Sequence, residues 1–122
     1  MTIVSPRKAH KYFKAKMEFT TGPVELDQMI KGGENINIVD VRSRADYEKE
    51  HIPGSISLPK GQWQTCSGLS REAVNVVYCY SEDCHLAASA ALEFTEQGYP
   101  VMELEGGFEG WKEHNLPVEV IS

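Results

Sequence analysis

The residues best suited to nucleophilic chemistry in this 122-residue chain are its three cysteines, Cys66, Cys79 and Cys84. Cys79 ends an apolar run at residues 74–79 whose composition is typical of a strand buried on both faces. At the carboxyl end of a parallel strand, a thiol meets backbone N–H groups and the positive end of the next helix, which favour thiolate and lower the thiol pKa. A small buried hydrophobe that completes the strand is the alternative interpretation of Cys79.

Cys84 lies five positions after Cys79, beyond a polar stretch. A curled loop can bring two such residues within disulfide reach, about 5.5 Å between Cα atoms. The pair is therefore a candidate thiol redox switch, although Cys84 can equally be an inert cysteine that faces the base of a helix. Cys66 lies in a different polar segment without a motif, and no role is assigned to it.

No metal or other cofactor is expected, because no second pair of Cys or His residues completes a ligand set with Cys79, Cys84 and His85.

The elements that must position these cysteines alternate between helices and strands. Helices are predicted at 6–16, in a short segment that stops at Gly32-Gly33, as a turn at 45–49, from Leu86 to Gly98, and in a last segment with Phe108 and Trp111. Strands are predicted at 36–41, 55–59, 74–79 and 101–104. Such alternation with short connections implies an α/β fold with a mostly parallel sheet covered on both faces. Ligands of these sheets bind beyond the carboxyl ends of the strands, where Cys79 falls.

Composition restricts the class of protein. With 41% hydrophobic and 25% charged residues, the chain is typical of one soluble domain. A net charge of −6 argues against nucleic acid as the main partner. No window approaches the ~20 apolar residues of a membrane span and no apolar run resembles a signal peptide, so a cytoplasmic location without a membrane partner is expected. The odd number of cysteines argues against a structural disulfide framework.

The charge is unevenly distributed along the chain. Five of the 12 basic residues precede the first acid, Glu18, which leaves 7 − 18 = −11 for the remainder. These five are Arg7, Lys8, Lys11, Lys14 and Lys16. A solvated basic face on an N-terminal helix and a docking surface for an acidic protein partner are both open interpretations.

Several separate motifs, in order from about residue 20 to residue 119, resemble those of a rhodanese-like (sulfurtransferase) domain. The first half of the resemblance consists of Ile38-Val39-Asp40-Val41-Arg42, then Tyr47, then Glu50-His51-Ile52-Pro53-Gly54-Ser55-Ile56. The second half consists of Val77-Tyr78-Cys79, the alanine-rich helix after it, Glu105-Gly106-Gly107-Phe108-Glu109-Gly110-Trp111, and Leu116-Pro117-Val118.

The resemblance implies a rhodanese-like three-layer fold with a central, mostly parallel five-stranded sheet flanked by helices. It divides the chain into an N-terminal basic helical extension at 1–19 and a rhodanese-like domain at 20–122. It further implies that Cys79 is the nucleophile and carries sulfur as a cysteine persulfide. Asp40 and Arg42 are then expected to be structural residues near the active site, a direct catalytic role for either being the alternative.

The active-site loop departs from the usual family pattern of six residues with arginine. The register of the following alanines predicts seven residues, namely Cys79, Tyr80, Ser81, Glu82, Asp83, Cys84 and His85. That length resembles the loop of the related dual-specificity phosphatases, which ends in an arginine able to clamp an oxyanion. Two carboxylates and no arginine disfavour phosphatase activity and weaken thiosulfate as the donor, unless the two acids are ordinary solvated turn residues.

Taken together, the residues and the resemblance predict a sulfurtransferase of the thiosulfate sulfurtransferase class, or a persulfide carrier. A small-molecule or protein persulfide is the expected donor, and Cys79 passes sulfane sulfur to a thiol or other nucleophilic acceptor. In this chemistry Cys84 is a candidate resolving thiol that attacks a persulfidated or oxidised Cys79.

Trp63 lies in the connection facing the expected site and is either a pocket wall or a core residue. A catalytically silent module that docks a partner through its basic helix or its loop, and the Cys79/Cys84 redox switch, are the alternatives.

Overall fold

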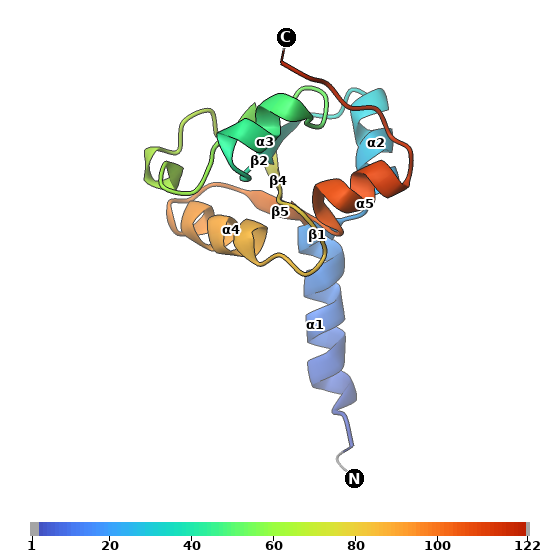
Figure 1. Ribbon diagram of the computed structural model, residues 1–122. Coiled ribbons are helices and arrows are strands. Elements are labelled where there is room, and N and C mark those ends of the chain that lie inside the picture. Colours follow the sequence, from blue (N-terminus) through green and yellow to red (C-terminus); the bar gives the residue numbers. More distant parts are fainter. Residues whose placement is uncertain (1–2, 122) are drawn as a thin grey trace.

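A parallel sheet of five strands forms the centre of the fold (Figure 1). The computed structural model describes residues 3–121, so Met1, Thr2 and Ser122 of the predicted extension and domain lie outside the described residues. The strands are β1 (Thr20–Thr21), β2 (Ile36–Asp40), β3 (Ile56–Ser57), β4 (Val74–Tyr78) and β5 (Val101–Leu104). They pair in the order β1-β5-β4-β2-β3, with every neighbouring pair parallel. The predicted α/β fold with a parallel five-stranded sheet is confirmed.

Helices connect the strands and cover the sheet. They are α1 (Pro6–Phe19), α2 (Pro23–Lys31), α3 (Arg44–Lys49), α4 (Leu86–Glu96) and α5 (Gly107–Glu113), with one 3-10 turn, η1 (Trp63–Thr65). The strand predicted at 55–59 is only two residues long, because Pro59 has no N–H to continue a ladder. The sequence did not predict β1, whose two residues form a strand only by pairing with Glu103 and Leu104 of β5.

Strands β2 and β4 pack against apolar clusters on both faces of the sheet, which explains their largely apolar sequences. Val39 of β2 and Val77 of β4 pack into one core cluster with Phe94 of α4. Their neighbours in the chain point the other way, into a second cluster under α2 and α5. The members of that second cluster are Leu26, Ile38, Ile52, Val76, Tyr78, Leu104, Phe108 and Trp111. The sheet therefore separates two cores, and the loop after β4 is anchored from both.

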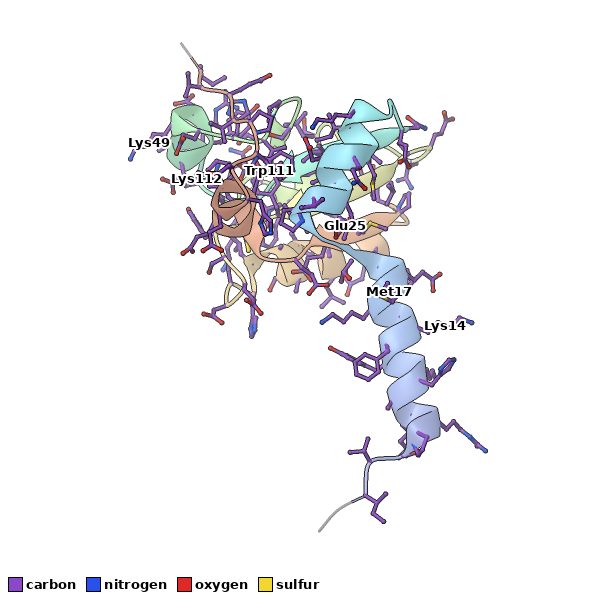
Figure 2. All side chains as sticks on the ribbon, turned by 90° about the vertical axis from the view of Figure 1, so that its right-hand side faces the viewer. Lys14, Met17, Glu25, Lys49, Trp111 and Lys112 are labelled. Carbon is purple, nitrogen blue, oxygen red and sulfur yellow. The ribbon has the colours of Figure 1, made fainter. Side chains whose placement is uncertain are left out.

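Helix α1 projects away from the body of the molecule (Figure 1). Ser5 caps it by accepting a hydrogen bond from the N–H of Lys8, and the helix buries none of its own residues. Side chains such as Lys14 and Met17 point into open space along it (Figure 2). In residues 3–121, no helix has both the length and the apolar sequence that crossing a membrane requires.

Candidate active site

Cys79 is the first residue after β4, and the loop that follows it ends where α4 begins at Leu86. The side chain of Cys79 belongs to the core cluster on the α4 face, and the residue is 3% exposed. The loop curls back on itself, because the N–H of Cys84 donates to the carbonyl of Ser81 at 3.1 Å. Seven residues, from Cys79 to His85, thus separate the strand from the helix.

The start of α5 holds the outer side of this loop in place. The N–H of Phe108 donates to the carbonyl of Cys79, and the N–H of Glu109 donates to that of Tyr80, both at 2.9 Å. Gly107 has a φ of +59°, and a Cβ there would lie 2.8 Å from the nitrogen of Ser81. A side chain at position 107 is therefore excluded by both conformation and space. The paired glycines between β5 and α5 were the sequence signal for this contact, which the sequence interpretation did not assign to the site.

The thiols of Cys79 and Cys84 lie together inside the loop. Cys79 Sγ donates to the carbonyl of Cys84 at 3.6 Å, and Cys84 Sγ accepts the N–H of Leu86 at 3.4 Å. The amides of Tyr80 and Ala87 also act to lower the pKa of both thiols, so they lie close enough to stabilise negative charge on either sulfur. Backbone amides at the start of α4 and at the start of the loop thus form a cradle around a pair of sulfur atoms.

This pairing divides the protons unequally between the two thiols. Burial, followed by the hydrogen bond to Cys84, raises the pKa of Cys79 to about 11. Burial acts in the same direction on Cys84, but the hydrogen bond from Cys79 and the amides of Leu86, Tyr80 and Ala87 outweigh it and lower the pKa of Cys84. The expectation of a lowered pKa at Cys79 is therefore wrong for the reduced protein. Cys84, the more exposed of the two, has the N–H of Leu86 in addition to the amides that act on both sulfurs, and the first thiolate forms on Cys84.

The order of titration predicts the order of alkylation. Iodoacetamide should modify Cys84 at a pH below the ordinary thiol midpoint of about 8.5, whereas Cys79 reacts only near pH 11. In Cys84→Ser the thiolate that holds the proton on Cys79 is gone, so the midpoint of Cys79 should fall. Initial rates against pH, with the alkylated cysteine identified by peptide mass, measure both effects. Faster alkylation of Cys79 than of Cys84 at pH 7 would contradict this assignment.

Tyr80 turns away from the thiols and fastens the loop to α3. Its hydroxyl donates to Oδ2 of Asp46 at 2.6 Å and accepts the N–H of Ser43 at 3.3 Å. The hydrogen bonds from Tyr80 and Ser43 lower the pKa of Asp46. The residue next to Cys79 therefore acts as a tether, and the space beside the thiols stays open.

Asp40 and Arg42 form a buried ion pair beneath the loop. Nη2 of Arg42 lies 2.7 Å from Oδ2 of Asp40, which also accepts the hydroxyl of Tyr78 at 2.8 Å. The same guanidinium donates to the carbonyl of Glu50 at 2.6 Å and lies 4.2 Å from the ring centre of Phe108. Within residues 3–121, no hydrogen bond joins either side chain to Cys79 or Cys84. The pair ties β2, β4, α3 and α5 together around the site.

A cavity of about 540 Å³ reaches Cys79 from the surface. Tyr12 and Phe19 of α1 line one side, and Ala88, Ala91 and Leu92 of α4 line the other. We call this cavity the α1–α4 groove. The sequence interpretation missed the contribution of α1, although Tyr12, Ala15, Lys16 and Phe19 have the spacing of one helix face.

The charged side chains of the α1–α4 groove are predominantly acidic. Glu82, Glu103 and Glu105 line it, with Lys16 as the one cation among its described lining residues. Burial and the neighbouring Glu105 raise the pKa of Glu103. Lys16 lies 3.5 Å from Glu105, which offsets part of its charge. The groove therefore favours neutral or singly charged sulfur compounds over divalent anions.

The remaining predicted site residues lie at the edge of the groove or outside it. Glu82 and Asp83 are exposed at the tip of the loop, and His85 precedes α4 without capping it through its side chain. In the described part of the chain, no three His, Cys, Asp or Glu side chains come together as a metal site. Trp63 is buried, donates its Nε1–H to the carbonyl of Leu58 at 2.9 Å and meets Phe94 edge-on. It is a core residue, so the interpretation of Trp63 as a pocket wall is wrong.

Comparison with known proteins agrees with this geometry. The family model described as "Rhodanese-like domain" matches residues 22–114. The chain is 39% identical to the thiosulfate sulfurtransferase GlpE of Coxiella burnetii over 83 residues, covering 66% of this chain and 76% of that protein. It is 32% identical to a sulfurtransferase of Allochromatium vinosum, covering 76% of this chain and 87% of that protein.

Among solved structures, the BH2092 protein from Bacillus halodurans is similar with a TM-score of 0.87 and 37% identity. The similarity covers 96% of this chain and 88% of that chain. A full-length protein from Lactobacillus plantarum is similar with a TM-score of 0.80 and 26% identity, over 95% of this chain and 99% of that chain.

Proposed function

Because the chain belongs to the rhodanese-like domain family, we propose that it transfers sulfane sulfur through a persulfide on Cys79 to a thiol or other nucleophilic acceptor. Its sulfurtransferase relatives support sulfur transfer as the general activity. The observation that carries the proposal is the position of Cys79, inside a cradle of amides at the inner end of the α1–α4 groove. Amides in such a cradle stabilise the terminal S⁻ of a persulfide by hydrogen bonding, so no acidic side chain has to protonate it.

The thiol pair supplies the proton transfer that the reaction needs. The thiolate of Cys84 takes the proton of Cys79 as Cys79 attacks the outer sulfur of a donor persulfide. A new S–S bond forms at Cys79, the S–S bond of the donor breaks, and the donor leaves as a thiolate. An acceptor thiolate then attacks the outer sulfur in the groove, becomes a persulfide itself and returns Cys79 as a thiolate. Cys84 thus offsets the raised pKa of Cys79 by acting as its base.

A low-molecular-weight or protein persulfide is the donor that the groove fits. Thiosulfate is a dianion, and three carboxylates face it in the groove, while the loop has no arginine to clamp it. A persulfide carries one charge at most at its reacting end and needs no such clamp. We therefore expect glutathione persulfide to be used well and thiosulfate to be used poorly.

The charge argument is tested by Glu82→Arg, which puts an arginine at the mouth of the groove. The rate with thiosulfate should rise about tenfold, because a repulsive charge becomes an attractive one near the bound dianion. Glu113→Arg, on the exposed end of α5, makes the same change of net charge away from the groove and should leave the rate within about twofold. Sulfur transfer to a thiol acceptor is measured with each donor. Equal wild-type rates with thiosulfate and glutathione persulfide would contradict the donor assignment, and no transfer from either would overturn the proposed function.

A catalytically silent binding module is the second candidate function, favoured by the protonated state of Cys79 in the reduced protein. In that case the exposed basic side chains of α1 form the docking surface. An acidic protein partner for this helix stays a prediction. The two candidates differ in one observable, since only a sulfurtransferase moves sulfur from a persulfide donor to an acceptor.

A further inference from the structure

Cys84 is half-buried at the edge of the core cluster on the α4 face, and it also takes part in the hydrogen bonding of the loop. Its sulfur accepts the N–H of Leu86 at 3.4 Å, and its carbonyl accepts the thiol of Cys79 at 3.6 Å. The third cysteine, Cys66, is also free but closes the η1 turn, where its N–H donates to the carbonyl of Trp63. The loop thus holds two free thiols in one cradle of amides, and the family chemistry requires only one of them.

The two sulfurs of a persulfide on Cys79 would have different surroundings. Cys79 lines the groove but is 3% exposed, so its own sulfur offers molecules in the groove only a small surface, whereas the added outer sulfur would be the more accessible of the two. An external thiol reaches the outer sulfur, and that attack transfers it. The inner sulfur faces Cys84 from within the same loop, since Cys79 Sγ lies 3.6 Å from the carbonyl oxygen of Cys84 in the reduced protein. Two nucleophiles therefore attack two different atoms.

We infer that Cys84 attacks the inner sulfur of the Cys79 persulfide, so that the protein releases sulfide and closes a Cys79–Cys84 disulfide. The inference rests on the proposed persulfide at Cys79. In this step the thiolate of Cys84 forms the new S–S bond and the bond between the inner and outer sulfurs breaks. The outer sulfur leaves as HS⁻ with the electron pair of that bond. The sulfane sulfur is reduced and the two cysteines are oxidised, so the step itself needs no further oxidant or reductant. A dithiol reductant, small or protein-borne, then reopens the disulfide for the next cycle.

Three features of the loop favour this step over simple storage of the persulfide. Both cysteines belong to one curled loop, with Cys79 Sγ hydrogen-bonded to the carbonyl of Cys84, so the reaction is intramolecular and gains a high effective concentration. The lowered pKa of Cys84 raises its thiolate fraction at a given pH, and the thiolate is the attacking form. The N–H of Leu86 holds Cys84 Sγ at 3.4 Å, which fixes the attacking side chain within the loop. The chain thus has an activity beyond transfer, namely reductive release of sulfide when no acceptor occupies the groove.

A single-turnover experiment with glutathione persulfide tests the inference. The fully reduced protein receives one equivalent of donor, excess donor is removed, and free sulfide is followed without added thiol. Wild type should release about one equivalent of sulfide and end as an internal disulfide, two hydrogens lighter than the reduced chain. Cys84→Ser should keep an added mass of about 32 Da on Cys79. It should release sulfide at least about 100-fold more slowly than wild type, because it has lost the intramolecular nucleophile. Cys66→Ser is the matched control and should behave as wild type.

The possible outcomes separate this inference from the proposed function. If Cys84→Ser loads sulfur on Cys79 but releases sulfide as fast as wild type, the resolving role of Cys84 is overturned and the persulfide function stands. If wild type neither releases sulfide nor passes sulfur to an added thiol acceptor, and Cys79 acquires no sulfur in Cys84→Ser or in Cys84→Ala, the proposed function fails and this inference fails with it. Cys84→Ala removes the acceptor of the Leu86 N–H, so agreement between the two variants assigns the effect to the missing thiol and not to a changed loop.

Discussion

Cys79→Ser is expected to lower sulfur transfer from glutathione persulfide by at least about 1,000-fold, because a hydroxyl is a far weaker nucleophile and cannot form a persulfide. The substitution is nearly isosteric at a site that is 3% exposed, so the loop and its amides should keep their places. The measurement is the initial rate at which a thiol acceptor gains sulfur from the donor. A matched substitution at the remote free thiol, Cys66→Ser, should keep the wild-type rate.

The contrast between these two variants decides what the rate loss means. Cys79→Ser and Cys66→Ser each remove one of the three free thiols. Only Cys79→Ser changes the residue that directly follows β4. Denaturant unfolding should give similar midpoints for both proteins, which shows that the loss is chemical. A Cys79→Ser protein that retains more than about a tenth of the transfer rate would place the sulfur-carrying atom elsewhere in the chain.

Asp40→Asn is expected to cost about 3–5 kcal/mol of unfolding free energy, because it leaves the guanidinium of Arg42 buried without its counter-ion. Asp40 is fully buried and Arg42 is 5% exposed, and the carboxylate also accepts the hydroxyl of Tyr78. An amide of the same shape keeps part of this hydrogen bonding and loses the charge. Urea unfolding should show a lower midpoint with an unchanged slope.

An exposed ion pair of the same type provides the control for this prediction. Arg44 and Glu48 lie one turn apart on α3 at 3.1 Å, with 59% and 48% of their side-chain surfaces exposed. Glu48→Gln should change the free energy of unfolding by no more than about 0.5 kcal/mol, because water screens the pair. If Asp40→Asn is no more destabilising than Glu48→Gln, the buried pair does not hold the architecture around the site.

Much of the fold could be predicted because local patterns and packing agree. Both faces of β4 are buried, so its largely apolar sequence, broken only by Asn75, identified a central parallel strand. The alanines of α4 and the glycine after it fixed the next helix to within about two residues at its end. The two-residue strands β1 and β3 carry no periodicity of their own and owe their existence to neighbours far away in the sequence.

The candidate site was predictable in its residues but not in its electrostatics. Position at the end of β4 made Cys79 a candidate, the resemblance to rhodanese-like domains favoured it as the nucleophile, and spacing made Cys84 a candidate partner. Which thiol holds the proton depends on where the amides of Leu86 and Ala87 point relative to each sulfur, and no pattern in the sequence contains that information. Gly107 shows the same limit, since its need for close approach to Ser81 appears only when α5 meets the loop.

The α1 helix illustrates how long-range placement changes an interpretation. Its basic residues suggested a surface, and most of them do lie in solvent. Tyr12 and Phe19 on another face of the same helix line the groove that reaches Cys79. A helix that the sequence presents as an extension therefore contributes one wall of the candidate active site.

The most direct test of a sulfur-carrying Cys79 is fragmentation mass spectrometry of the intact Cys84→Ser protein after brief exposure to glutathione persulfide. This variant lacks the thiol that we propose to discharge the persulfide. It also lacks the Cys84 groups that raise the pKa of Cys79, so Cys79 ionises more readily and attacks the donor without that base, and the intermediate should accumulate. The account predicts one added sulfur, a mass gain of about 32 Da, confined to fragments that contain Cys79. An unmodified Cys79, with the added sulfur on Cys66 or absent altogether, would contradict it.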